Sequence, residues 1–134
     1  MTNLEKKNSE VGKFLGFLHN GGKIKQLLED IHLITLEVAG LEFSENIEEI
    51  FSKLKKGDHL DLFRENRNPY DELAILVKYE GEKIGYVPRK HNPILANLMD
   101  GGKQLYGIID DVYEDQVYKD YKFKVVIFKI YMKE

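Results

Sequence analysis

Short strand-like segments dominate this chain from residue 31 onward, and they constrain its fold more than any other feature. Some alternate apolar and polar residues, as strands with one buried face do, and others are rich in β-branched residues. The Glu80–Lys83 turn is typical of a tight hairpin, because Gly81 tolerates a positive φ. The segments are Ile31–Val38, His59–Glu65, Leu73–Tyr79, Ile84–Val87, Gln104–Tyr113 and Tyr121–Met132. They predict a small, mostly antiparallel sheet.

Apolar residues at helical spacing occur between these strands and before the first of them. Two short helices are predicted within residues 8–30, where Gly21-Gly22 divides them. Two further helices are predicted over Asn46–Leu54 and over residues 92–101. The whole pattern predicts an α+β domain that is mainly β, with a small antiparallel barrel and helices across its openings.

Local signals predict how several of these elements begin or end. Asn46, with Glu49 three residues later, resembles a capping box. Asn92 is predicted to cap a helix whose first residue is Pro93, where the missing N–H costs nothing. The stretch Leu41–Phe43 is predicted to be extended, and the polar stretch Glu114–Asp120 is predicted to be a loop.

The length of 134 residues suits one globular domain. Residues 1–30 are predicted to be a helical N-terminal extension, and residues 31–134 the barrel. The chain contains no cysteine, which excludes disulfides, thiolate zinc sites and cysteine nucleophiles. It also has no apolar run long enough to span a membrane and no signal-peptide pattern, so we expect a cytoplasmic protein without a membrane partner.

The net charge of −3 excludes a protein that coats duplex DNA through bulk electrostatics. Charge is nevertheless segregated along the chain. Residues 78–103 contain five lysines and arginines against three acids, whereas residues 37–61 contain three cations against seven acids. Any phosphate binding is therefore expected at a local patch.

The segment Asn68–Ala74 allows two interpretations. Pro69 fixes φ and Asp71 can accept nearby backbone N–H groups, which is sufficient to stabilise a turn. Tyr70, at the apex of that turn, is also the kind of residue on which proteins stack an unpaired base. Turn stabilisation and base stacking both remain open on the local chemistry alone.

A second segment, Gly85–Asn92, combines an aromatic residue with cations just before a predicted helix. Arg89 and Lys90 lie beside the N-terminus of that helix, whose N–H groups and partial positive charge favour an anion such as phosphate. The alternative is a short pair of solvated surface cations.

Four blocks together resemble the HIRAN domain family. The blocks are Val38–Leu41, Gly57-Asp58, Asn68–Ile75 and the stretch from Gly81 through Pro88 to Gly101. Their order and spacing carry the resemblance, which covers about residues 34–112. It implies an OB-like barrel and the capture of single-stranded DNA 3′ ends in DNA repair or processing.

The resemblance also implies roles for individual residues. Tyr70 would stack on terminal bases, with Phe43 as a second aromatic wall, and Asp71 would accept a hydrogen bond from the 3′-hydroxyl. Arg89 would hold a phosphate, and Tyr86 and Lys90 complete the predicted DNA site. Glu42 stands where DNA-binding members have an arginine, and Tyr86 where they have a histidine. The late aromatic residue of the family matches Tyr113, Tyr118 or Phe123.

Nothing in the sequence indicates catalysis. The four histidines are far apart, there is no nucleotide-binding loop or nucleophile elbow, and Asp110-Asp111 point to opposite faces of a strand. We therefore expect a non-enzymatic DNA-binding module without a cofactor or metal, acting with a helicase or nuclease. The rival hypothesis, motivated by Glu42 and the net negative charge, is a protein-interaction adaptor that keeps the fold without binding DNA ends.

Overall fold

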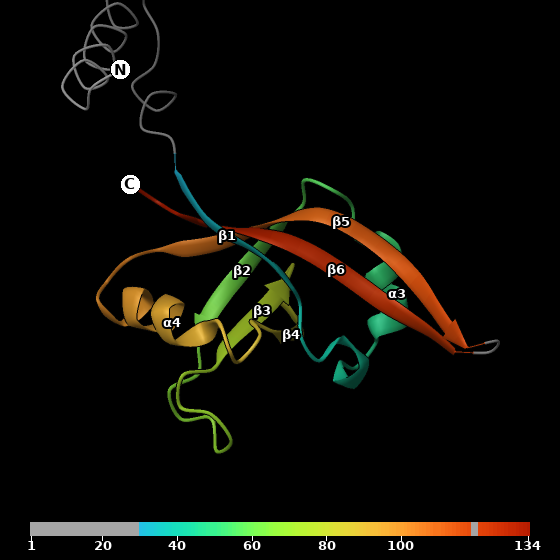
Figure 1. The fold of residues 1–134 in the computed structure, drawn as a ribbon, viewed down its shortest axis with the longest axis horizontal. Helices are drawn as coiled ribbons and strands as arrows, with labels where there is room; N and C mark the ends of the chain where they lie inside the picture. The colour runs from blue at the N-terminus through green and yellow to red at the C-terminus, as the bar shows by residue number, and fades with distance from the viewer. Residues whose placement is uncertain (1–29, 119–120) are drawn as a thin grey trace, which may run out of the picture. The chain divides into compact units, whose positions relative to one another are not determined.

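The computed structural model describes residues 30–118 and 121–134, which form one curled antiparallel sheet with short helices beside it (Figure 1). The strands are β1 (Ile31–Glu37), β2 (His59–Arg64), β3 (Ile75–Tyr79), β4 (Glu82–Tyr86), β5 (Leu105–Tyr118) and β6 (Tyr121–Met132). The helices are the 3₁₀ helix η1 (Leu41–Phe43) and the α-helices α3 (Ile47–Lys53) and α4 (Asn92–Asp100). All six predicted strands are present, and the mainly β class is confirmed for the described residues.

The strand order is β1-β6-β5-β2-β3-β4, and the inner face of the curled sheet is the core. Alternation along β2 shows why: Leu60 and Leu62 are buried inside, whereas His59, Asp61 and Phe63 lie on the outer face. The largest fully buried side chains are Phe128, Leu60, Ile75, Ile84, Ile109 and Ile130. The helices α3 and α4 contribute Ile50, Leu95 and Ala96 to the same core.

The predicted barrel takes the form of a half-barrel whose two edges meet at one point. Ala39 and Tyr86 exchange backbone hydrogen bonds of 2.8 and 2.9 Å, which join the segment after edge strand β1 to edge strand β4. A side chain at Gly85 would clash with the Ala39 carbonyl oxygen and lie 2.7 Å from Val38 Cγ1. The close approach of the two edges therefore requires glycine at position 85.

Two predicted caps are wrong. Asn46 precedes α3, but its φ of 58° is left-handed and its side chain makes no capping bond, since a capping residue normally needs an extended backbone. Helix α4 starts one residue earlier than predicted, after His91. The Asn92 amide instead donates to Asp71 Oδ2, 2.7 Å away.

Two predicted segments also differ. Leu41–Phe43 is a 3₁₀ turn rather than extended, because Gly40 adopts a left-handed φ of 76° and its carbonyl accepts the Phe43 N–H. Residues 114–118 continue β5 and pair with β6, so the predicted loop is much shorter. These polar residues are part of a two-stranded arm, formed by β5 and β6, that extends past α3 in Figure 1.

The predicted helical extension over residues 1–30 lies outside the described residues, apart from Asp30, and stays a prediction. No helix in the described part of the chain has both the length and the apolar character needed to cross a membrane.

Candidate nucleic-acid interface

The loop between β2 and β3 holds Tyr70 and Asp71 in a fixed conformation. Asn68 Oδ1 accepts the backbone N–H of Tyr70 at 2.9 Å and that of Asp71 at 3.2 Å. This is an Asx turn, in which a short polar side chain substitutes for a backbone acceptor. The turn interpretation of the sequence is confirmed for Asp71, whose Oδ1 accepts the Leu73 N–H at 3.0 Å, whereas the part played by Asn68 was not predicted. The Tyr70 side chain is exposed at the surface.

Arg64, at the end of β2, forms hydrogen bonds that hold the β2–β3 loop in place. Its guanidinium donates to the carbonyl oxygens of Ala74 at 2.7 Å and Glu72 at 3.0 Å. It also pairs with Asp100 at the end of α4, with Nε and Oδ1 2.9 Å apart. Because the guanidinium is planar and rigid, these contacts fix the loop against both β3 and α4.

Asp71 is the best-held carboxylate of the site. Oδ1 accepts the Leu73 N–H at 3.0 Å, Oδ2 accepts the Asn92 amide at 2.7 Å, and Arg89 Nε lies 3.8 Å from Oδ2. The Asn92 hydrogen bond, followed by that from Leu73, holds the pKa of Asp71 below its ordinary range. The carboxylate therefore stays ionised at neutral pH. Each oxygen has a second lone pair that can accept a further hydroxyl donor.

Tyr70, Asp71 and Arg89 line one hollow of about 420 Å³. The Tyr70 side chain is 86% exposed, while its backbone carbonyl accepts Arg89 Nη2 at 3.2 Å. The Arg89 side chain is 76% exposed, so most of its guanidinium faces solvent. The structure thus brings three of the predicted site residues together, with an open aromatic ring, an ionised acceptor and a cation.

Tyr86 lies outside this hollow but is joined to it by hydrogen bonds. Its hydroxyl donates to Glu65 Oε1 at 2.6 Å and accepts Lys83 Nζ at 3.0 Å. Asn68 Nδ2 donates to the same Glu65 oxygen at 3.2 Å. The Tyr86 hydrogen bond is the main reason that the pKa of Glu65 lies below its ordinary range. Tyr86 therefore acts on the Tyr70 loop through Glu65 and Asn68.

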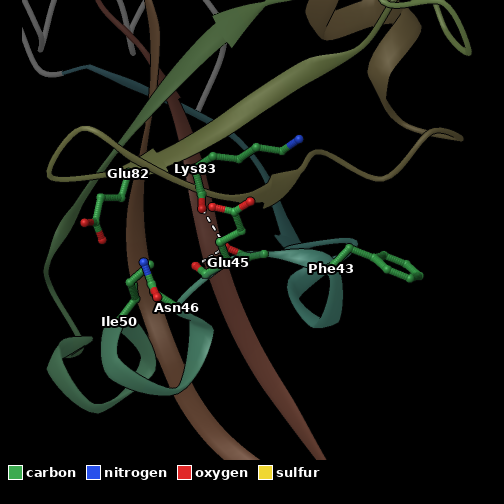
Figure 2. A pocket seen from close by; sticks show the side chains of 7 residues that line it. Phe43, Glu45, Asn46, Ile50, Glu82 and Lys83 are labelled. Atoms are coloured by element: carbon green, nitrogen blue, oxygen red, sulfur yellow. Dashed lines mark hydrogen bonds between the residues drawn. The ribbon is translucent and has the colours of Figure 1, made fainter.

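Phe43 and Lys90 do not line the Tyr70 hollow. Phe43 is 85% exposed at the mouth of a separate hollow of about 400 Å³, also lined by Asn46, Glu82 and Lys83. Figure 2 shows its ring pointing away from the other labelled residues. Lys90 lines an apolar hollow between β1 and α4, with Leu33, Ile34, Pro93, Ile94, Leu95 and Leu98 among its other walls.

Glu42 also lies apart from Phe43. It lines a fourth hollow with Pro88, Phe123 and Lys124, and also a neighbouring hollow that shares these two β6 residues and includes Lys122. Lys124 pairs with Glu48 at 2.7 Å. Phe123, one of the late aromatic candidates, lies beside Pro88 and Glu42.

Sequence reasoning missed Arg64, Glu65 and Asn92 as site residues. Arg64 and Glu65 look like ordinary polar residues at the end of a strand, and Asn92 resembles a helix cap. Each acts through partners distant in sequence, which local periodicity does not reveal. The one available signal was that the Asn68–Ala74 block and the segment before Asn92 both occur in the family pattern.

Comparison with known proteins identifies the family and the fold. A family model described as HIRAN domain matches residues 31–128. A crystal structure of a protein from Lactobacillus plantarum is similar, with a TM-score of 0.60 and 29% identity over 77% of this chain and 97% of that one. The crystal structure of the HIRAN domain of human HLTF has a TM-score of 0.53 and 21% identity, over 75% of this chain and 76% of that one. No curated protein matches the sequence.

Proposed function

This chain belongs to the HIRAN domain family, and from that premise we propose that it binds single-stranded DNA at a 3′ end without catalysing a reaction. The observation that carries the proposal is the hollow in which Tyr70, Asp71 and Arg89 meet. We further propose a role in DNA repair or processing in the cytoplasm, together with a helicase or nuclease, on the family membership alone.

In this proposal Tyr70 stacks on a terminal base. Stacking on an aromatic ring is tolerant of sequence, because every base has a π-face. The Tyr70 ring is exposed while its backbone is fixed by Asn68 and Arg89, so little ordering of the loop is required on binding. Phe43, on η1, is 85% exposed and lines a different hollow. It could therefore stack only on a base of a DNA strand long enough to reach beyond the Tyr70 hollow.

Asp71 would distinguish a free 3′-hydroxyl from a phosphorylated end. Its ionised carboxylate can accept a hydrogen bond from a hydroxyl, whereas a terminal phosphate would place like charges together. Arg89, beside it, would neutralise the preceding phosphodiester. The Asp71 carboxylate beside the Arg89 guanidinium therefore suits the 3′ end of a DNA strand better than its interior.

The test compares oligonucleotides that end in 3′-hydroxyl or 3′-phosphate, by fluorescence anisotropy with a 5′ label. The expected result is tighter binding of the hydroxyl end, and loss of that preference in Asp71→Asn. Tyr70→Ala should weaken both ends alike. Equal affinity for the two ends, or an unchanged preference in Asp71→Asn, would contradict end recognition.

A protein-interaction adaptor is the second candidate. The apolar hollow between β1 and α4 favours it, because Ile94 is exposed there beside Leu33, Pro93 and Leu98. An adaptor would retain a helicase or nuclease in a pull-down after nucleic acid has been digested, and Ile94→Glu would abolish that capture. A partner that is lost on digestion would favour the DNA-binding function instead.

A further inference from the structure

A second aromatic surface adjoins the Tyr70 loop on the outer face of β2, β3 and β4. Phe63 lies opposite Leu76, and Leu76 lies opposite Tyr86, so the three side chains form one cross-strand row. In the next row, Lys78 lies between Lys83 and Asp61, and the Asp61 carboxylate is itself 3.0 Å from His59 Nε2. We call Phe63, Leu76, Lys78, Lys83 and Tyr86 the Phe63 patch.

Each aromatic ring of the Phe63 patch has a lysine beside it. Lys78 Nζ lies 4.9 Å from the centroid of Phe63, and Lys83 Nζ lies 4.7 Å from that of Tyr86. Phe63 is 48% exposed although it is paired within strand β2. Exposed rings interleaved with cations are the pattern by which sheet surfaces bind single strands, with bases on the rings and phosphates on the cations.

The Phe63 patch is connected directly to the proposed end site. Glu65, two residues after Phe63, accepts hydrogen bonds from Tyr86 of the patch and from Asn68 of the loop. Because these bonds occupy its carboxylate, Glu65 ties the two surfaces together and its charge is partly offset by Lys83 and Lys78. A strand whose end is held at Tyr70 can leave over this surface.

The two other exits from the loop suit DNA less well. The region beyond Pro88 has Glu37, Glu42 and Glu48 against Lys122 and Lys124, and Lys124 is already paired with Glu48. The hollow beyond Lys90 is lined mainly by aliphatic side chains, on which bases do not stack as they do on aromatic rings. Phosphates are repelled at the first exit, and bases find little stacking surface at the second.

We propose that the Phe63 patch carries the DNA strand onward from the captured end, with a base stacked on Phe63 and phosphates at Lys78 and Lys83. This inference rests on the proposed function and extends it to nucleotides on the 5′ side of the end. It predicts that affinity depends on oligonucleotide length, through residues that take no part in recognising the 3′-hydroxyl.

The test measures anisotropy for a dinucleotide and an octanucleotide of thymidine, each with a 3′-hydroxyl. Phe63→Leu should weaken octanucleotide binding roughly tenfold, as expected for the loss of one stacked base, and leave dinucleotide binding unchanged. Lys78→Gln should lower the slope of log K against log salt by about 0.7 for the octanucleotide only. Tyr131→Leu is the matched control: Tyr131 is an aromatic residue of β6 that packs with Tyr106 and His32, and its replacement should change neither affinity.

The outcomes separate the two proposals. If the wild-type chain binds neither oligonucleotide, both proposals fail. If the dinucleotide binds with 3′-hydroxyl preference but Phe63→Leu leaves octanucleotide binding intact, only the path over the Phe63 patch is overturned. The path over the Phe63 patch is also overturned if Phe63→Leu weakens the dinucleotide equally, or if Tyr131→Leu has the larger effect, because the strand would then run elsewhere.

Discussion

Replacing Asn92 by leucine tests whether a buried amide holds the proposed end-binding carboxylate. Asn92 is 2% exposed, and its Nδ2 donates to Asp71 Oδ2 at 2.7 Å. A hydrogen bond to a charged group contributes about 1.5–3 kcal/mol. The Asp71 side chain is 19% exposed, so water can replace part of the lost bond, and leucine keeps the side-chain volume. We therefore expect Asn92→Leu to lower the free energy of unfolding by about 2 kcal/mol at pH 7.

The pH dependence of this loss identifies its cause. Asp71 has a folded-state pKa below its ordinary value of 3.8, chiefly because of the Asn92 hydrogen bond. A depressed carboxyl pKa contributes stability above the unfolded-state pKa, and that stability disappears as the pH falls through the folded-state pKa. The difference between wild type and Asn92→Leu should therefore be largest near neutrality and shrink below about pH 4.

Urea unfolding at pH 7 and pH 3 measures both quantities, provided that the slope with denaturant is unchanged. Asn97→Leu is the matched control, because Asn97 is an exposed asparagine of the same helix and should change stability by less than about 0.5 kcal/mol. An equal loss at both pH values in Asn92→Leu would show that Asn92 acts through packing and would refute the argument.

Three further predictions concern the closure of the sheet, the Glu65 link and phosphate binding. Gly85→Ala should destabilise the fold by about 2 kcal/mol or more, because the added Cβ would clash with the Ala39 carbonyl. Gly101→Ala is the control: Gly101 has a negative φ, so this variant should lose far less stability in thermal unfolding. Tyr86→Phe removes the hydroxyl whose hydrogen bond lowers the pKa of Glu65. This variant should destabilise the fold by about 1.5–3 kcal/mol at pH 7, and by less at acidic pH, where Glu65 is protonated. A destabilisation that does not depend on pH would contradict the role of Glu65. Arg89→Gln should leave thermal stability nearly unchanged but lower the salt dependence of single-stranded DNA binding by about 0.7 in log–log slope, and an unchanged slope would remove Arg89 from phosphate contact.

Strand periodicity predicted most of the fold because each strand has one face in the core. The alternation of Leu60 and Leu62 with His59 and Asp61 already specifies which face of β2 is buried. Only the end of β5, residues 114–118, was predicted as a loop instead of a strand. Residues 114–116 lie on a solvated two-stranded arm, where polar residues are compatible with strand as well as with loop.

The local signals at helix ends failed where a distant partner took the side chain. Asn92 has the sequence environment of an N-cap, but its amide bonds to Asp71, twenty-one residues earlier. Tyr70, Asp71 and Arg89 could be assembled from the family resemblance, whereas Arg64 and Glu65 could not. Their importance depends on contacts with Ala74, Asp100 and Tyr86 that only the folded chain provides.

The charges that surround Glu42 in the folded chain differ from those near it in the sequence, and this changes the expected effect of Glu42 on DNA binding. The acidic stretch around Glu42 suggests repulsion of phosphate at the aromatic wall formed by Phe43. In the folded chain the two neighbouring residues line different hollows, and Lys122 and Lys124 from β6 reach the one with Glu42. Glu42 therefore bears on the exit beyond Pro88 rather than on the Tyr70 hollow. If the strand leaves over the Phe63 patch, Glu42→Arg should improve octanucleotide affinity only through long-range attraction, and that gain should vanish at high salt.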